Sequence, residues 1–265
     1  MTMASDTLLD YTDKNLHAKD LMESHFSNGD ICFIEENVGA PLKLLHELFS
    51  SGQVKGDKLL DMSAEGALFQ LFSASNVFKE MYVMNFIDSN NRHFKRWLEK
   101  EEGATDWSFV SKRVCQLEGN VDGWQEKEEQ LRKAIVEVIK CDISAGSVDS
   151  IVLPEVDCVT TAYLFNVICQ TKEDIVKNLK TLTSCLKIGG YLVFLIALNM
   201  SFFRVGPHKF FALTVDDKSV KESVTKAGFV IEKEEVILTS VEKDIVDYKN
   251  LLFLVARKER NLQKL

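Results

Sequence analysis

The stretch Leu59-Leu60-Asp61-Met62-Ser63-Ala64-Glu65-Gly66 decides the fold class of this chain. Its apolar part, residues 58–62, is bounded by Gly56-Asp57 before it and by small residues after it. Such a pattern is typical of a buried β-strand. The loop that follows has the position of a nucleotide-cofactor loop, although Gly66 is the one glycine left in it. We therefore expect the first strand and loop of a cofactor-binding α/β protein.

Strands and helices alternate outward from this unit. Upstream, we expect a helix that Pro41 opens and Gly52 ends. Downstream, residues 81–86 form a second strand, and Asp88 is placed to cap the helix after it. The apolar residues of these two helices recur at helical spacing: Leu42, Leu45, Leu48, Phe49, Phe94, Trp97 and Leu98.

A polar span at residues 101–130 interrupts the alternation. It runs into a predicted helix with Leu131, Ile135 and Val138 on one face. Residues 156–164 then form a third strand.

Caps and glycines delimit the last elements. Thr171 with Asp174 approximates a capping box, and the helix that it opens carries Leu186 and ends at Gly189-Gly190. The remaining elements are strands at residues 191–198, 229–238 and 251–257 and a helix at residues 216–227. This alternation predicts a mostly parallel sheet with helices on both faces. The last two strands have no helix between them, so we expect one of them to run antiparallel at the edge.

Composition and charge argue against several classes of function. With 46% hydrophobic residues, 3 Pro and 13 Gly, the chain has the composition of a compact globular protein. A net charge of −8 disfavours nucleic acid as a partner, because phosphate binding needs a basic face. The six cysteines lack metal-ligand spacing and suit a reduced protein, so we expect no metal site. No signal peptide or membrane-span pattern is present, and we expect a cytoplasmic monomer.

Short motifs along most of the chain carry a family resemblance. In order, they are Val54-Lys55-Gly56-Asp57, Ser73-Ala74, Phe78-Lys79-Glu80, Trp97-Leu98, Asp106-Trp107-Ser108, Leu117-Glu118-Gly119, Glu126-Lys127-Glu128, Lys140-Cys141-Asp142, Val205-Gly206, Lys209-Phe210 and Val255-Ala256-Arg257-Lys258. The chain resembles the small-molecule amine N-methyltransferases that include nicotinamide, phenylethanolamine and indolethylamine N-methyltransferases. The resemblance implies an α/β fold with a Rossmann-like, mostly parallel seven-stranded sheet that binds S-adenosylmethionine. It also implies one domain, residues 1–265, with an N-terminal helical cap region (1–52) and an insertion (103–135).

The resemblance assigns cofactor-binding positions, several of which are substituted. Where the family loop has glycines, this chain has Ser63 and Glu65, whose side chains must leave the cofactor hollow open. Asn85 replaces the acidic residue that holds the ribose, which removes the charge-assisted part of that hydrogen bond. Asp142 is placed to accept from the adenine amine. The cofactor-binding positions so implied are Phe26, Ser63, Phe69, Asn85, Asn90, Asp142, Ile143 and Ala162.

The implied substrate-binding positions are Leu21, Ile196 and Ala212. Ile196 stands where the nicotinamide enzyme has an Asp, and Ala212 where it has a Ser. The expected acceptor is therefore more apolar than nicotinamide: an aromatic or aliphatic amine, or a thioether.

Nearby aromatic residues leave alternatives open. Phe202, Phe203, Phe210 and Phe211 either line the pocket or belong to the core. Leu21, His25 and Phe26 replace three family tyrosines. His25 is either a base that titrates near neutral pH or an incidental residue.

Two functions remain open on these residues. One is an S-adenosylmethionine-dependent N-methyltransferase for a small amine. In-line methyl transfer depends mainly on positioning and desolvation, so no single missing side chain excludes it. The other is a non-catalytic binding or regulatory module, which the substitutions at Ser63, Asn85 and the tyrosine positions favour. A dehydrogenase does not fit, because no G-x-G-x-x-G follows the first strand.

Overall fold

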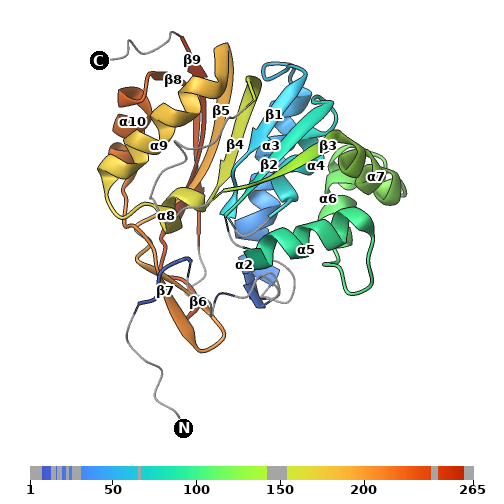
Figure 1. Ribbon diagram of the computed structural model, residues 1–265, viewed down its shortest axis with the longest axis horizontal. Helices are drawn as coiled ribbons and strands as arrows, with labels where there is room; N and C mark the ends of the chain where they lie inside the picture. The colour runs from blue at the N-terminus through green and yellow to red at the C-terminus, as the bar shows by residue number, and fades with distance from the viewer. Residues whose placement is uncertain are drawn as a thin grey trace.

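The structure, a computed structural model, describes residues 8–12, 16, 20, 21, 24, 25, 31–64, 67–86, 88–141, 154–239 and 244–259. One seven-stranded sheet with the order β3-β2-β1-β4-β5-β9-β8 forms its centre (Figure 1). The strands are β1 (Lys58–Asp61), β2 (Glu80–Asn85), β3 (Ile135–Lys140), β4 (Val156–Ala162), β5 (Leu186–Leu198), β8 (Phe229–Leu238) and β9 (Asn250–Lys258). The predicted seven-stranded, mostly parallel sheet is confirmed.

The antiparallel strand lies one place further in than the sequence predicts. The five strands from β3 to β5 pair in parallel. β9 is antiparallel to both β5 and β8, so β8 is the edge strand. Burial explains this order. β9 is an apolar strand that is almost wholly buried, whereas after its buried first residue β8 has only half-buried and exposed residues, as suits an edge strand.

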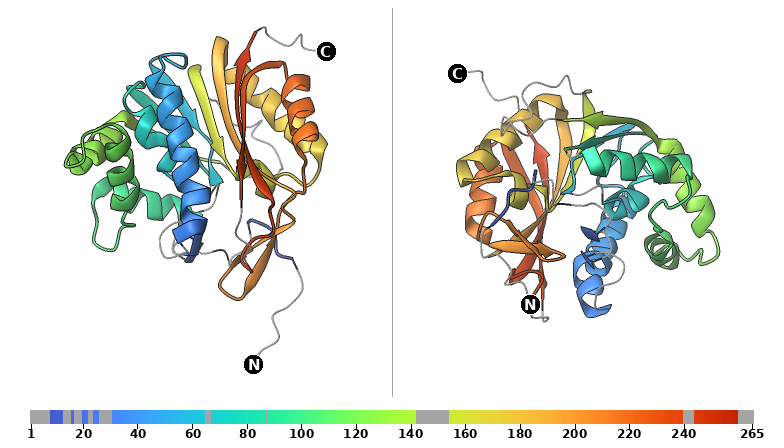
Figure 2. Two further views of the ribbon diagram at one scale, coloured as in Figure 1. Left: turned by 180° about the vertical axis from the view of Figure 1, so that it is seen from behind. Right: turned by 60° about the horizontal axis from the view of Figure 1, so that its bottom comes forward.

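Helices cover both faces of the sheet. They are α2 (Ile31–Ile34), the π-helix η2 (Glu35–Gly39), α3 (Ala40–Ser50), α4 (Phe69–Ala74), α5 (Asp88–Glu99), α6 (Ser108–Leu117), α7 (Trp124–Ala134), α8 (Leu164–Ile168), α9 (Lys172–Cys185) and α10 (Asp217–Lys226). In Figure 1, α5 and α9 lie in front of the sheet, whereas α3 comes to the front in the reverse view of Figure 2. The expected helical covering of both faces is confirmed.

The helix after Thr171 begins as predicted but ends earlier. Thr171 and Asp174 form the capping box of α9. The helix stops at Cys185, so Leu186 opens β5 and Gly189-Gly190 lies inside that strand rather than at a helix end. Lys258 of β9 explains the early end, because its Nζ donates to the carbonyls of Thr183 and Leu186, both at 2.5 Å. A lysine that binds the last carbonyls of a helix stabilises its terminus.

The predicted helix through Leu131, Ile135 and Val138 is also wrong in part. α7 ends at Ala134, and residues from Ile135 onward form β3 beside β2. The run is rich in β-branched residues, which favour a strand. Leu131, Ile135 and Val138 are three or four residues apart, which is also the spacing of residues on one face of a helix. β4 likewise ends at Ala162, two residues before the predicted limit.

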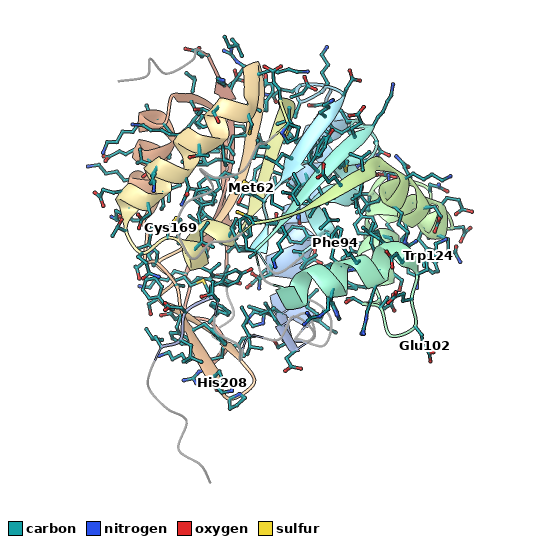
Figure 3. All side chains as sticks on the ribbon, in the orientation of Figure 1. Met62, Phe94, Glu102, Trp124, Cys169 and His208 are labelled. Carbon is teal, nitrogen blue, oxygen red and sulfur yellow. The ribbon has the colours of Figure 1, made fainter. Side chains whose placement is uncertain are left out.

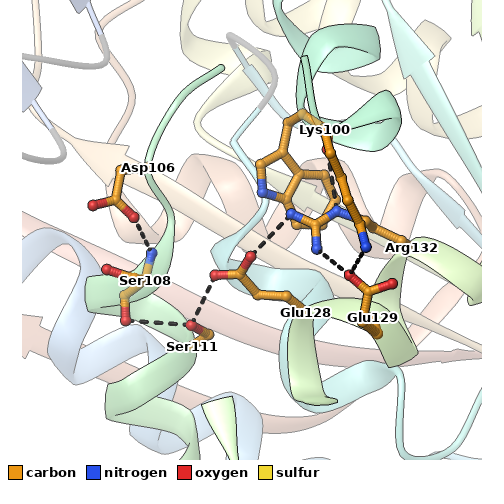
Figure 4. A network of polar contacts seen from close by, with 8 residues as sticks. Lys100, Asp106, Ser108, Ser111, Glu128, Glu129 and Arg132 are labelled. Carbon is orange, nitrogen blue, oxygen red and sulfur yellow. Dashed lines mark hydrogen bonds and ion pairs between the residues drawn. The ribbon is translucent and has the colours of Figure 1, made fainter. Parts of the chain in front are cut away.

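The polar span contains α6, which buries Val110 and Val114 in the core, and side-chain bonds join this span to neighbouring helices (Figure 4). Glu128 of α7 accepts from Ser111 at 3.1 Å and from Arg132 at 2.9 Å. The Arg132 guanidinium lies 4.2 Å from the centre of the Trp97 ring. Asp106 accepts from the backbone N–H of Ser108 at the start of α6, at 2.8 Å. These family-motif residues therefore have a structural role that joins α5, α6 and α7.

A separate hairpin, β6 (Phe202–Val205) and β7 (His208–Phe211), projects below the sheet. Figure 3 places His208 at its tip and Met62 near the centre of the molecule. Two distant segments add to the hairpin edges. Leu9 forms a parallel bridge with Phe210, and Val246 forms an antiparallel bridge with Phe203. The N-terminal segment and the segment before β9 therefore meet on the hairpin.

Candidate functional site

The carboxyl ends of β1 and β4 are tied together by a buried carboxylate. Asp61, the last residue of β1, accepts from Thr160 at 2.6 Å, from Ser63 at 2.9 Å and from Gln70 at 3.1 Å. Burial raises the pKa of Asp61 to about 6, although these hydrogen bonds act in the opposite direction. Ligands of open parallel sheets bind outside these strand ends.

Ser63, one of the glycine replacements, turns its side chain sideways into the seam between the two strands. Its Oγ donates to Asp61 and accepts from the backbone N–H of Ala162 at 3.1 Å. Ser63 is 2% exposed. Both hydrogen bonds of the Ser63 hydroxyl are therefore made inside the protein, between β1 and β4.

Phe69 and Ala162 connect this loop to a second hollow. Phe69 opens α4 and is fully buried. Its ring centre lies 6.4 Å from that of Tyr163, the residue that follows Ala162. Tyr163 has φ +60, a left-handed conformation that costs a non-glycine residue about 1–2 kcal/mol. Its hydroxyl donates to the carbonyl of Asn37 at 2.7 Å, which fixes the ring. Strain of this kind clusters at ligand sites.

The second hollow is an apolar cavity of about 40 Å³ beyond the ends of β4 and β5. It is lined by His25, Phe33, Asn37, Tyr163, Val167, Ala197, Met200, Phe203, Val246 and Tyr248. Of the described residues, those that line it include no Asp, Glu, Lys or Arg. The cavity therefore suits an uncharged ligand with an aromatic or aliphatic body.

The polar groups of the cavity lining come from four parts of the chain: His25, Asn37, Tyr163 and Tyr248. Asn37 lies in the π-helix η2, and its side-chain amide donates to the carbonyl of Phe33 at 3.2 Å. The Tyr248 hydroxyl hydrogen-bonds with the Asn37 side chain, and burial raises the pKa of Tyr248. Burial lowers the pKa of His25 to about 4, so that His25 is neutral at neutral pH.

The predicted substrate positions do not line this cavity. Leu21, Ile196 and Ala212 are all buried, and the lining contains none of them. The lining residue on β5 is Ala197, the neighbour of Ile196. Among the four phenylalanines with open roles, Phe203 lines the cavity and Phe210 stacks on it, with ring centres 5.1 Å apart.

The structure describes the side chains of only some of the predicted cofactor positions. Ser63, Phe69 and Ala162 are brought together as stated above. Asn85 ends β2 and Asn90 lies in α5, but only their backbones are described. Phe26, Glu65, Asp142 and Ile143 lie outside the described residues.

Sequence inspection missed several residues of the cavity. Tyr163 carried a weak signal, because it directly follows the predicted position Ala162. Asn37, Val246 and Tyr248 carried none, since nothing in their local sequence indicates that the chain returns to the ends of β4 and β5.

Other kinds of site find no support in the described part of the chain. No group of three His, Cys, Asp or Glu side chains there is arranged to hold a metal ion. None of its helices has both the length and the apolar character of a membrane span. All the cysteines except Cys32 are buried.

Known proteins resemble this chain in sequence and in fold. A family model described as the NNMT/PNMT/TEMT family matches residues 7–259. Nicotinamide N-methyltransferase of Homo sapiens is 35% identical over 257 residues, which are 96% of each chain. Indolethylamine N-methyltransferase of Mus musculus is 33% identical over 249 residues, 93% of this chain and 94% of that protein. A solved S-adenosylmethionine-dependent methyltransferase from Methanosarcina mazei has a TM-score of 0.55 and 12% identity, covering 79% of this chain and 96% of its own. That likeness shows a shared fold.

Proposed function

The chain belongs to the NNMT/PNMT/TEMT family, and from this premise we propose that it transfers the methyl group of S-adenosylmethionine to a nitrogen of a small amine. The observation that carries the proposal is the full-length match, 35% identity over 96% of both chains. No observation favours the non-catalytic alternative, since Ser63 turns its hydroxyl away from the outer face of the loop.

The proposed cofactor site combines described residues at the ends of β1 and β4 with positions that the family resemblance assigns. In the proposed arrangement, the backbone around Ser63 and the wall formed by Phe69 and Ala162 hold the methionine part. Asn85 and Asn90 hold the ribose, Phe26 covers the cofactor, and Asp142 with Ile143 holds the purine. When bound, S-adenosylmethionine supplies an electrophilic methyl group on a sulfonium.

The cavity holds the acceptor in this proposal. Tyr163 lines the cavity and its ring centre lies 6.4 Å from that of Phe69, which in this proposal puts the acceptor near the cofactor loop. The apolar lining excludes water and disfavours an ammonium ion, because burial penalises the charged form of an amine. Only a neutral nitrogen has the lone pair that attacks a methyl group. The cavity therefore selects the reactive protonation state.

Ile196 and Ala212 are buried apolar residues at the positions that the resemblance assigns to the substrate, so the proposed acceptor is a more apolar amine than nicotinamide, or a thioether. We also propose that the protein is a cytoplasmic monomer that acts on small molecules.

Calorimetric titration with S-adenosylhomocysteine tests the function. We expect micromolar binding, followed by turnover of tryptamine or phenylethanolamine in a panel with nicotinamide and dimethyl sulfide. Ligand at about a hundred times Kd stabilises the fold by roughly 2.7 kcal/mol, so a thermal shift provides a second readout. Absence of binding at millimolar ligand would leave the non-catalytic module. Rapid turnover of nicotinamide would contradict the assigned roles of Ile196 and Ala212.

A substitution pair sharpens this test. Asn85→Asp restores a carboxylate at the ribose position and is expected to tighten binding about tenfold, since a hydrogen bond to a charged group is stronger. Asn120→Asp makes the same change at an exposed residue between α6 and α7 and should leave Kd unchanged.

A further inference from the structure

His25 is held in one orientation at the wall of the cavity. Its ring meets the rings of Phe33 and Phe203 edge-on, at centre distances of 6.1 and 6.3 Å and interplanar angles of 64° and 80°. His25 is only 9% exposed. The two aromatic rings leave the imidazole little freedom to rotate.

Ser24 sets the tautomer of this imidazole. The Ser24 hydroxyl has one hydrogen, which it donates to the carbonyl of Asp20 at 2.7 Å or of Leu21 at 3.2 Å. The same oxygen lies 2.8 Å from Nδ1 of His25. Since the hydroxyl hydrogen is used elsewhere, Nδ1 carries the proton and donates it to Ser24. Nε2 on the other side of the ring is then a neutral acceptor, and it is buried.

No full charge confronts this acceptor from the described cavity wall. The titratable groups of the lining are His25 itself and the phenols of Tyr163 and Tyr248. The Glu36 carboxylate, on η2, acts on Tyr248 and raises its pKa. A neutral imidazole in such surroundings accepts an N–H well, whereas as an imidazolium it would repel a cationic product.

From this geometry we propose that Nε2 of His25 accepts a hydrogen bond from an N–H of the methyl acceptor and thereby favours primary and secondary amines over acceptors that have no N–H. This inference rests on the proposed function. The N–H directed at Nε2 turns the nitrogen lone pair away from His25, so that it faces the methyl donor.

The hydrogen bond strengthens during the reaction. The nitrogen lone pair forms the new N–C bond, the S–C bond breaks, and its electron pair stays on sulfur. The nitrogen becomes positive and keeps its hydrogen, which passes to water after the product leaves. A hydrogen bond from a cationic N–H is about twice as strong as a neutral one. His25 therefore stabilises the transition state more than the bound amine, which raises kcat.

The proposal divides methyl acceptors into those with an N–H and those without one. Primary and secondary amines have the N–H that Nε2 requires. Tertiary amines, pyridine-type nitrogens and thioethers have none, so they gain nothing from His25.

Two matched probes separate these classes: phenylethylamine and its N,N-dimethyl derivative. In His25→Phe, which keeps a ring but loses the acceptor, we expect kcat for phenylethylamine to fall about tenfold or more, equivalent to roughly 1.4 kcal/mol. The tertiary amine should change less than about twofold, since it makes no such bond. His25→Gln, whose amide oxygen can accept, should recover most of the rate. His46→Phe on α3 is the control and should match the wild type, and S-adenosylhomocysteine affinity should stay the same in every variant.

Equal losses for the two probes in His25→Phe would overturn the proposal while leaving the methyltransferase function intact. Failure of the function itself looks different, because wild-type protein would then bind no S-adenosylhomocysteine. A readout without turnover is the long-range ¹H–¹⁵N spectrum of the His25 ring. We expect a neutral Nδ1–H tautomer whose Nε2 resonance moves on addition of phenylethylamine. An Nε2–H tautomer, or a resonance that the amine leaves unmoved, would also overturn it.

Discussion

Ser63 offers the sharpest test of how the substituted loop is held. The change is Ser63→Ala, which removes the hydroxyl that joins Asp61 to the backbone N–H of Ala162. Both partners are buried. After the change, the Asp61 carboxylate keeps Thr160 and Gln70 as donors, whereas the Ala162 N–H loses its acceptor in the described structure.

The expected magnitude follows from these contacts. A buried N–H left without an acceptor costs about 1–3 kcal/mol, and the lost bond to the carboxylate adds about 1 kcal/mol, so Ser63→Ala should lower the free energy of unfolding by about 2–4 kcal/mol. At about 2–4 °C per kcal/mol for a domain of this size, Tm should fall by roughly 5–15 °C. Ser63→Gly should cost a further ~0.5–1 kcal/mol, because glycine has more backbone freedom to lose.

Urea unfolding with a matched control measures the effect. Ser73 on α4 is a buried serine whose Oγ has no hydrogen-bond partner within the described residues. Ser73→Ala should therefore be neutral or stabilising by about 1 kcal/mol. If the free energies of unfolding of Ser63→Ala and Ser73→Ala agree within about 0.5 kcal/mol, the hydrogen bonds of Ser63 between β1 and β4 do not stabilise the fold. That result would refute the argument for Ser63.

Three further predictions concern buried ionisable groups, each measured by urea unfolding. Lys258→Met should cost about 2 kcal/mol, because the carbonyls of Thr183 and Leu186 lose their donor, and a neutral result would show that water replaces the ammonium. The pKa of Asp61 rises from 3.8 to about 6 on folding, so the native state binds more protons between these values and stability falls as pH rises through them. Asp61→Asn should remove this fall, and an unchanged slope would contradict the assignment. The pKa of His25 falls from 6.5 to about 4, so its contribution is complete above pH 6.5 and is lost as pH falls toward 4. His25→Gln should keep more of its stability in acid, and a steeper acid loss would speak against a buried neutral imidazole.

Sequence patterns predicted elements well where the determining contacts are local. The capping box of Thr171 and Asp174 needs only residues three apart, and it forms as predicted. The apolar run before Ser63 is a strand because its neighbours in sequence already mark its limits. Predictions failed where a distant partner decided the outcome: Lys258 of β9 ends α9 before Gly189, and pairing with β2 turns Ile135 onward into a strand.

The sequence by itself determined the fold class, the family and the kind of chemistry, because hydrophobic periodicity, caps and motif order are properties of neighbouring residues. Only the tertiary structure decided which way Ser63 turns and which side chains meet around the cavity. His25, Tyr163 and Tyr248 lie far apart in the chain, and they line one hollow because the strand ends and the hairpin bring them together. Burial, tautomer and pKa depend on which groups surround a side chain, and folding alone supplies those neighbours.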